Sequence, residues 1–108
     1  MVIYMRRDDD ISIRKKAVLD YDSSIGGAIA YLRKCQKLDQ HDVAEHLECS
    51  QSLVSKIEAG QRSIKVAELA IFADAMGLPI DAVIDIIREA LLNPDAYKPP
   101  QRRRHSKR

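Results

Sequence analysis

Four neighbouring side chains combine hydrogen-bonding groups with one positive charge, and they are Gln51, Ser52, Ser55 and Lys56. They alternate with an apolar stripe that Leu53, Val54 and Ile57 form at helical spacing. A helix with such groups near its start can hydrogen-bond to base edges when it enters the major groove of DNA. An ordinary solvent-facing helix has a similar polar face, so the pattern alone leaves both interpretations open.

These residues lie in a stretch, Asp39 to Gly60, that is predicted to form two short helices joined by a tight turn. Asp39 can cap the first helix and Ser50 the second, because Asp and Ser side chains accept hydrogen bonds from the free N–H groups of a first turn. Apolar residues recur at helical spacing in both segments, so the two helices are expected to pack together. Gly60 can end the second helix with a positive φ.

The stretch and its flanks, from about Ile25 to Ile84, resemble the Cro/CI-type repressor helix-turn-helix family, also called the xenobiotic-response-element (XRE) group. The residues that match the family pattern are Arg33, Leu38, Asp39, Gln40, Val43, Ala44, Cys49, Ser50, Val54, Ser55, Glu58 and Gly60. The resemblance implies an all-α, five-helix, lambda-repressor-like DNA-binding domain. Lys37 and Glu48 stand where the family usually has glycine. A positive φ at either would cost on the order of 1 kcal/mol.

The resemblance also implies roles for individual side chains. The DNA-binding residues that we predict are Gln40, Ser50, Gln51, Ser52, Ser55, Lys56, Arg62 and Lys65. Gln51 and Ser52 occupy the main base-contacting positions of the family, and Gln40 the position that bridges a phosphate and the recognition helix. Arg33 and Glu58 occupy the positions of an ion pair that fixes this helix against the core. The alternative for that pair is two exposed charges that contribute little.

The net charge of +2 hides a segregation along the chain. Residues 1–21 include five basic and four acidic side chains, residues 22–97 seven basic and twelve acidic ones, and residues 98–108 six basic and no acidic ones. The central part is therefore acidic, and the basic groups needed for phosphate must be concentrated locally. Composition alone is a weak argument for DNA binding, so the motif is the main one.

The same sequence gives expectations about compartment and cysteine state. It has no secretory signal and no apolar run long enough to span a membrane, so we expect a cytoplasmic, nucleoid-associated protein. Cys35 and Cys49 lie within apolar helical patterns. They are expected to be reduced and buried, without a disulfide or a metal role.

Residues 1–22 are predicted to be an N-terminal extension, with alternatives left open for its structure. Ile11 and Ile13 alternate with polar residues, as in a strand, but Ile11–Tyr21 could equally form a short helix capped by Asp10. A β-hairpin or a dimerisation arm would fit. The DNA-binding domain is then assigned to residues 23–93 and a basic tail to residues 94–108.

The helix before the motif is predicted to span Ile25–Gln36, with Ser23 or Ser24 as its cap. Gly26 and Gly27 weaken its first turn and leave room for another backbone to approach closely.

Two helices are predicted after the motif, Val66–Met76 and a last helix from near Pro79–Asp81 to about Leu92. The apolar residues expected along the first are Val66, Leu69, Ala70, Phe72 and Ala73. The last helix is apolar on more than one face, which favours a partner, most simply another copy. The predicted dimer contacts are Ile84, Ile87 and Leu91. The alternative is that the N-terminal segment covers this surface.

Lys98–Arg108 has no apolar periodicity and is typical of a disordered basic tail. Such a tail can bind phosphate without sequence preference, although it could also serve only solubility. His41 and His46 are five residues apart, so they do not share a helix face as the histidines of a zinc protease do. No enzyme, metal or cofactor is expected.

Two functional classes remain. The first is a transcriptional regulator, a repressor that binds double-stranded DNA at a palindromic operator as a homodimer. The second is an antitoxin that binds a toxin and also regulates its own operon.

Overall fold

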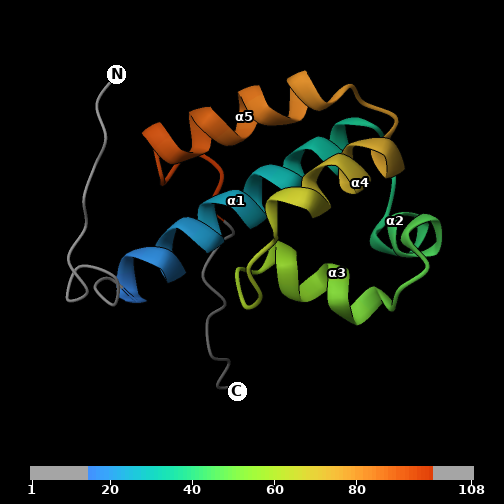
Figure 1. The fold of residues 1–108 in the computed structure, drawn as a ribbon, viewed down its shortest axis with the longest axis horizontal. Coiled ribbons are helices and arrows are strands. Elements are labelled where there is room, and N and C mark those ends of the chain that lie inside the picture. Colours follow the sequence, from blue (N-terminus) through green and yellow to red (C-terminus); the bar gives the residue numbers. More distant parts are fainter. Residues whose placement is uncertain (1–14, 99–108) are drawn as a thin grey trace, which may run out of the picture.

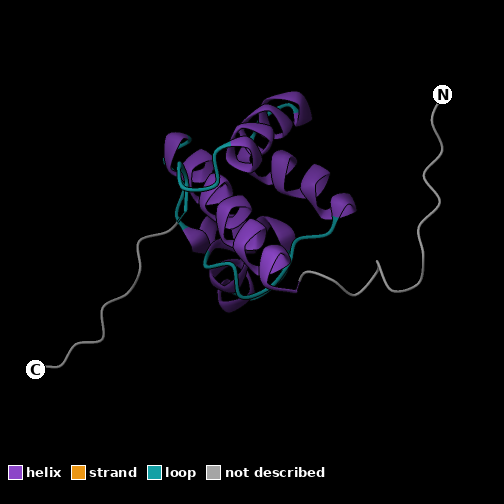
Figure 2. Cartoon of the chain, turned by 90° about the vertical axis from the view of Figure 1, so that its left-hand side faces the viewer, coloured by secondary structure: helices purple, strands orange, loops and turns teal. Residues whose placement is uncertain are grey.

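The computed structural model describes residues 15–98. Five helices follow one another in this range: α1 (Lys15–Cys35), α2 (Gln40–Leu47), α3 (Gln51–Glu58), α4 (Val66–Met76) and α5 (Ile80–Leu92). The long α1 packs against α5 on one side and α3 on the other (Figure 1). Short loops join the helices, and residues 15–98 contain no strand (Figure 2). The predicted all-α, five-helix fold is confirmed.

The start of α1 differs from the prediction, because the helix begins at Lys15 rather than Ile25. Ser24 is therefore not a cap but a fully buried residue inside the helix. Its hydroxyl donates to the carbonyl oxygen of Pro94 at 2.6 Å, and the carbonyl of Asp20 lies at 3.3 Å, one turn earlier. A Ser within a helix is accommodated in this way because its hydroxyl bonds to a carbonyl.

The predicted boundary between residues 22 and 23 consequently falls inside α1. Residues 15–21 are helical, as in the helical alternative for Ile11–Tyr21, but they continue directly into the rest of α1. The predicted strand residues Ile11 and Ile13 and the Asp10 cap lie outside the described residues. The basic tail beyond Lys98 lies outside them as well.

The glycine pair of α1 allows two close backbone approaches, as predicted. A Cβ on Gly26 would lie 2.2 Å from the carbonyl oxygen of Ile57 in α3, and a Cβ on Gly27 1.5 Å from that of Tyr97. Both distances are shorter than any real contact. Only glycine at these positions lets α3 and the segment after α5 lie directly on α1.

The caps of the central motif form where the sequence predicts them. The Asp39 side chain accepts the Asp42 N–H at 2.8 Å, and the Asp42 side chain accepts the Asp39 N–H at 3.0 Å, which completes a reciprocal capping box at α2. The Ser50 hydroxyl accepts the Leu53 N–H at 3.1 Å at the start of α3. These bonds satisfy N–H groups that have no partner within the helices.

Lys37 and Glu48 adopt left-handed backbone, with φ of 60° and 58°. The turns thus keep the geometry that glycine usually supplies, at a cost of about 1 kcal/mol each. At Glu48 the turn is held by a hydrogen bond from the Cys49 N–H to the Ala44 carbonyl at 3.0 Å. Gly60, just after α3, has the predicted positive φ, at 79°.

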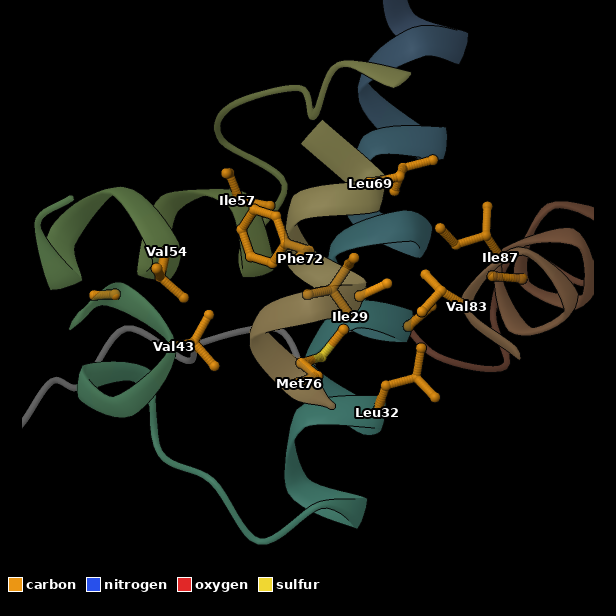
Figure 3. Packing of buried hydrophobic residues seen from close by; sticks show 14 residues of the cluster. Ile29, Leu32, Val43, Val54, Ile57, Leu69, Phe72, Met76, Val83 and Ile87 are labelled. Carbon is orange, nitrogen blue, oxygen red and sulfur yellow. The ribbon is translucent and has the colours of Figure 1, made fainter. Parts of the chain in front are cut away.

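All five helices contribute to one core (Figure 3). The core residues labelled in the figure are Ile29, Leu32, Val43, Val54, Ile57, Leu69, Phe72, Met76, Val83 and Ile87. The expectation that both cysteines are buried is wrong for Cys35, the last residue of α1, which is exposed, and Cys49 is only partly buried. Val66, the first residue of α4, is 84% exposed.

Candidate nucleic-acid interface

The outer face of α3 carries the polar residues that the sequence singled out. Gln51, Ser52, Ser55 and Lys56 are all exposed, whereas Val54 and Ile57 from the same helix are buried. Gln51 and Ser55 are one turn apart, as are Ser52 and Lys56, so the four side chains form one continuous strip. Ser50 is exposed immediately before them and uses its oxygen to cap the helix.

A buried ion pair joins the end of α3 to α1, as predicted. Arg33 Nε donates to Glu58 Oε2 at 2.7 Å and its second terminal nitrogen to Oε1 at 2.9 Å. The side chains are only 9% and 6% exposed. The remaining terminal nitrogen donates to the Leu38 carbonyl at 2.8 Å. The hydrogen bonds that Arg33 donates to Glu58 raise the pKa of Arg33 against the opposing effect of burial, and the pair connects the end of α3 to α1.

Gln40, the first residue of α2, connects this ion pair to the exposed strip. Its amide nitrogen donates to Glu58 Oε1 at 2.9 Å, and its amide oxygen lies 3.5 Å from the amide nitrogen of Gln51. The second distance is at the long limit of a hydrogen bond. Gln51 is therefore positioned next to a side chain that the buried pair holds in place.

The two basic residues predicted in the loop after α3 have different surroundings. Arg62 makes a bidentate ion pair with Glu68, at 2.8 and 3.0 Å, and also donates to the Ser63 carbonyl at 3.1 Å. This pair lowers the pKa of Glu68 to about 2. Lys65 is exposed. Lys65 and Lys56 are thus better placed than Arg62 to meet a phosphate from outside.

Sequence reasoning missed the partner of Arg62, although a signal was available. Glu68 is the third residue of α4, and its side chain accepts the Lys65 N–H at 2.8 Å. A Glu at the third position of a helix often accepts a hydrogen bond from the backbone N–H of the residue just before the helix. That preference places the Glu68 carboxylate beside the loop that contains Arg62.

A family model described as a helix-turn-helix domain matches residues 24–85. The match covers more than half of the chain, including the whole of α2, α3 and α4. The chain belongs to the helix-turn-helix domain family. This result supports the Cro/CI-type, XRE-like resemblance, and with it DNA binding and transcription regulation. Comparison with curated proteins gave no match.

In this helix-turn-helix protein the three predicted dimer residues on α5 are not equivalent. Ile84 is 43% exposed and Leu91 39% exposed, so both are available at the surface. Ile87 is only 7% exposed and belongs to the core. Ile87 therefore has little surface left for a second copy, because α5 packs on α1 within the monomer. Ile80, 39% exposed, lies one turn before Ile84 on the same side of the helix.

The described residues offer no group of His, Cys, Asp and Glu side chains suited to a metal ion. In residues 15–98, no helix has the length and hydropathy that crossing a membrane requires. Helix-turn-helix DNA-binding domains are typically not enzymes.

Proposed function

We propose that this helix-turn-helix protein is a transcriptional repressor that binds a palindromic operator as a homodimer. The observation that carries the proposal is the exposed polar strip of α3, backed by the buried Arg33–Glu58 pair. A groove-binding helix must hold its side chains in a fixed position, and this pair supplies a rigid support. The proposal places the protein in the cytoplasm, associated with the nucleoid.

Within the proposal, Gln51 and Ser52 contact base edges from the first turn of α3. A Gln amide can pair bidentately with adenine or donate to guanine. Lys56, one turn further along, can reach a guanine or a phosphate, and Ser50 and Ser55 can donate hydroxyl hydrogen bonds.

Gln40 and Lys65 flank the strip and are proposed to contact the DNA backbone. Gln40 is already hydrogen-bonded to Glu58, so a phosphate contact at Gln40 would fix the depth of α3 in the groove. Gln40→Ala should therefore weaken binding to all sequences about equally. Arg62 can contact the DNA backbone only with the part of its guanidinium group that is not hydrogen-bonded to Glu68 and Ser63.

Two recognition helices are proposed to act together, because one covers too few base pairs for useful specificity. In such dimers the helices enter successive major grooves about 34 Å apart. The exposed residues Ile80, Ile84 and Leu91 form an apolar stripe on α5 that a second copy can cover. Ile84→Asp should therefore weaken the dimer without opening the core, and analytical ultracentrifugation measures the change. An unchanged dimer would place the interface elsewhere.

The basic segment Lys98–Arg108 is proposed to neutralise phosphates. The chain before it is anchored on α1, since Ser24 donates to the Pro94 carbonyl and the Tyr97 backbone lies against Gly27. Deleting Lys98–Arg108 should leave the preferred sequence unchanged and flatten the slope of log K against log[salt] by about 0.9 per lost phosphate contact. An unchanged slope would show that the segment does not contact DNA.

The test of the proposed function is selection of bound sequences from random DNA by the purified protein alone. We expect enrichment of a two-fold symmetric sequence whose half-site centres are about one helical turn apart. An antitoxin would instead gain order or stability only when a second protein is added. Failure to enrich any sequence, with a folded dimeric protein, would contradict the proposal.

A further inference from the structure

An open apolar groove of about 210 Å³ lies beside the recognition helix, between the helix-turn-helix and α4. Its apolar walls are formed by Leu47, Cys49, Leu53, Ile57, Ile71 and Phe72. Ile57 and Phe72 are buried and form the floor, while Ile71 is 53% exposed at the edge. Leu47, Cys49 and Leu53 pack on the core but are only partly covered. Apolar surface of this kind is stabilised when an apolar segment covers it.

The chain contains a short apolar segment of suitable composition outside the described residues. Val2, Ile3, Tyr4 and Met5 are consecutive, and the residues between them and α1 are mostly charged. Arg6 and Arg7 follow at once. The groove has the complementary charge nearby, since Glu45 and Glu48 are exposed beside its wall residues Leu47 and Cys49.

The start of α1 lies within reach of the groove. Asp22 of α1 accepts a hydrogen bond from Ser63 in the loop between α3 and α4. The same loop carries Arg62, which pairs with Glu68, and Glu68 lines the groove. Lys15 is about 10 Å further along α1 from Asp22 at 1.5 Å per residue. Residues 6–14 can span about 30 Å when extended, so the chain is long enough to return to the groove.

We propose that residues 2–5 of the same chain dock in this groove. The apolar side chains would cover Leu53 and Ile71, and Arg6 and Arg7 would lie near the acidic end of α2. Docking would link the N-terminus of the protein to the turn and to α3, and so support the helix that carries the exposed polar strip. The inference does not depend on DNA binding, and it is tested without DNA.

The two cysteines provide an internal test, because Cys49 lines the groove and Cys35 is exposed at the end of α1. The full chain is treated with N-ethylmaleimide, and the rate at each thiol is measured by peptide mass spectrometry. If the segment is docked about 80–90% of the time, Cys49 is open to the reagent only for the remaining roughly 10–20%. The double variant Ile3→Asp, Tyr4→Asp should then raise the ratio of the Cys49 rate to the Cys35 rate about five- to tenfold. A synthetic peptide of residues 1–13 should restore the lower ratio.

Matched variants separate docking from loss of folding. Ser12→Asp, outside the apolar segment, should leave the ratio unchanged. On α4, Ile71→Glu should raise the ratio, whereas Val66→Glu, also exposed but outside the groove, should not. An equal ratio in the wild type and the Ile3/Tyr4 double variant would overturn the proposal. Protection that increases with protein concentration would also overturn it, because the docked segment would then come from another copy.

Discussion

Two arginine–glutamate pairs with nearly the same geometry allow the role of burial to be measured directly. Arg33–Glu58 and Arg62–Glu68 are both bidentate, with nitrogen–oxygen distances between 2.7 and 3.0 Å. The side chains of the first pair are 9% and 6% exposed, and those of the second 32% and 27%. We predict that only the first pair contributes a large coupling energy.

The expected loss of unfolding free energy in each variant follows from how far its ion pair is removed from water. Removing one partner of a buried pair leaves an uncompensated charge and costs about 3–5 kcal/mol. Arg33→Met and Glu58→Leu should each lower the free energy of unfolding by about that amount. The double variant should lose less than the sum of the two single losses, and the difference, the coupling energy, should be about 1–3 kcal/mol. The same substitutions at Arg62 and Glu68 should give a coupling of about 1 kcal/mol or less, because water and salt screen the exposed pair.

The measurement is urea unfolding of the wild type and of the three variants of each cycle, followed by circular dichroism. A double-mutant cycle cancels terms that belong to one residue alone, such as the hydrogen bond from Arg33 to the Leu38 carbonyl. Equal couplings in the two cycles would refute the reasoning from burial. A coupling near zero for Arg33–Glu58 would show that the pair does not hold α3 in place.

Three further predictions concern stability and are measured by thermal or urea unfolding. Gly27→Ala should destabilise by about 1–3 kcal/mol through overpacking, because its Cβ would lie 1.5 Å from the Tyr97 carbonyl oxygen; a neutral effect would contradict the close approach. Glu48→Gly should stabilise by up to about 1 kcal/mol by removing left-handed strain at φ 58°, and a loss of stability would show that the strain is small. Arg62 lowers the pKa of Glu68 to about 2, so their ion pair stabilises the protein above about pH 4.5 and loses this effect as the pH falls toward 2. Glu68→Gln should therefore flatten the pH dependence of the free energy of unfolding between these pH values. An unchanged pH dependence would contradict the assignment.

The central motif could be predicted from the sequence because its determinants are local. The Asp39 and Ser50 caps need partners only three residues away. The positive φ at Glu48 can be anticipated only through the family resemblance, because Glu48 stands where the family usually has glycine. The Arg33–Glu58 pair is a long-range contact, and its prediction required the family resemblance rather than the spacing of residues.

The differences from the expectations occur where distant segments decide the outcome. Ser24 has the sequence features of a helix cap, but it lies inside α1 and hydrogen-bonds to the Pro94 carbonyl, 70 residues away. Ile87 is apolar like Ile84, and only the packing of α5 on α1 separates the buried residue from the exposed one. A periodic pattern identifies apolar residues, but it cannot say which neighbouring helix will cover them.

The most direct test of the central claim is to compare the sequence preference of the wild type with that of Gln51→Ala. Selection from random DNA, read at every position, should show that Gln51→Ala relaxes the preference at one base pair of each half-site and loses about 1–3 kcal/mol of specific binding. Gln61→Ala is the matched control, since it removes the same exposed side chain just beyond the other end of α3 and should leave the preference unchanged. An identical preference at every position for the wild type and Gln51→Ala would contradict the claim that the first turn of α3 contacts bases.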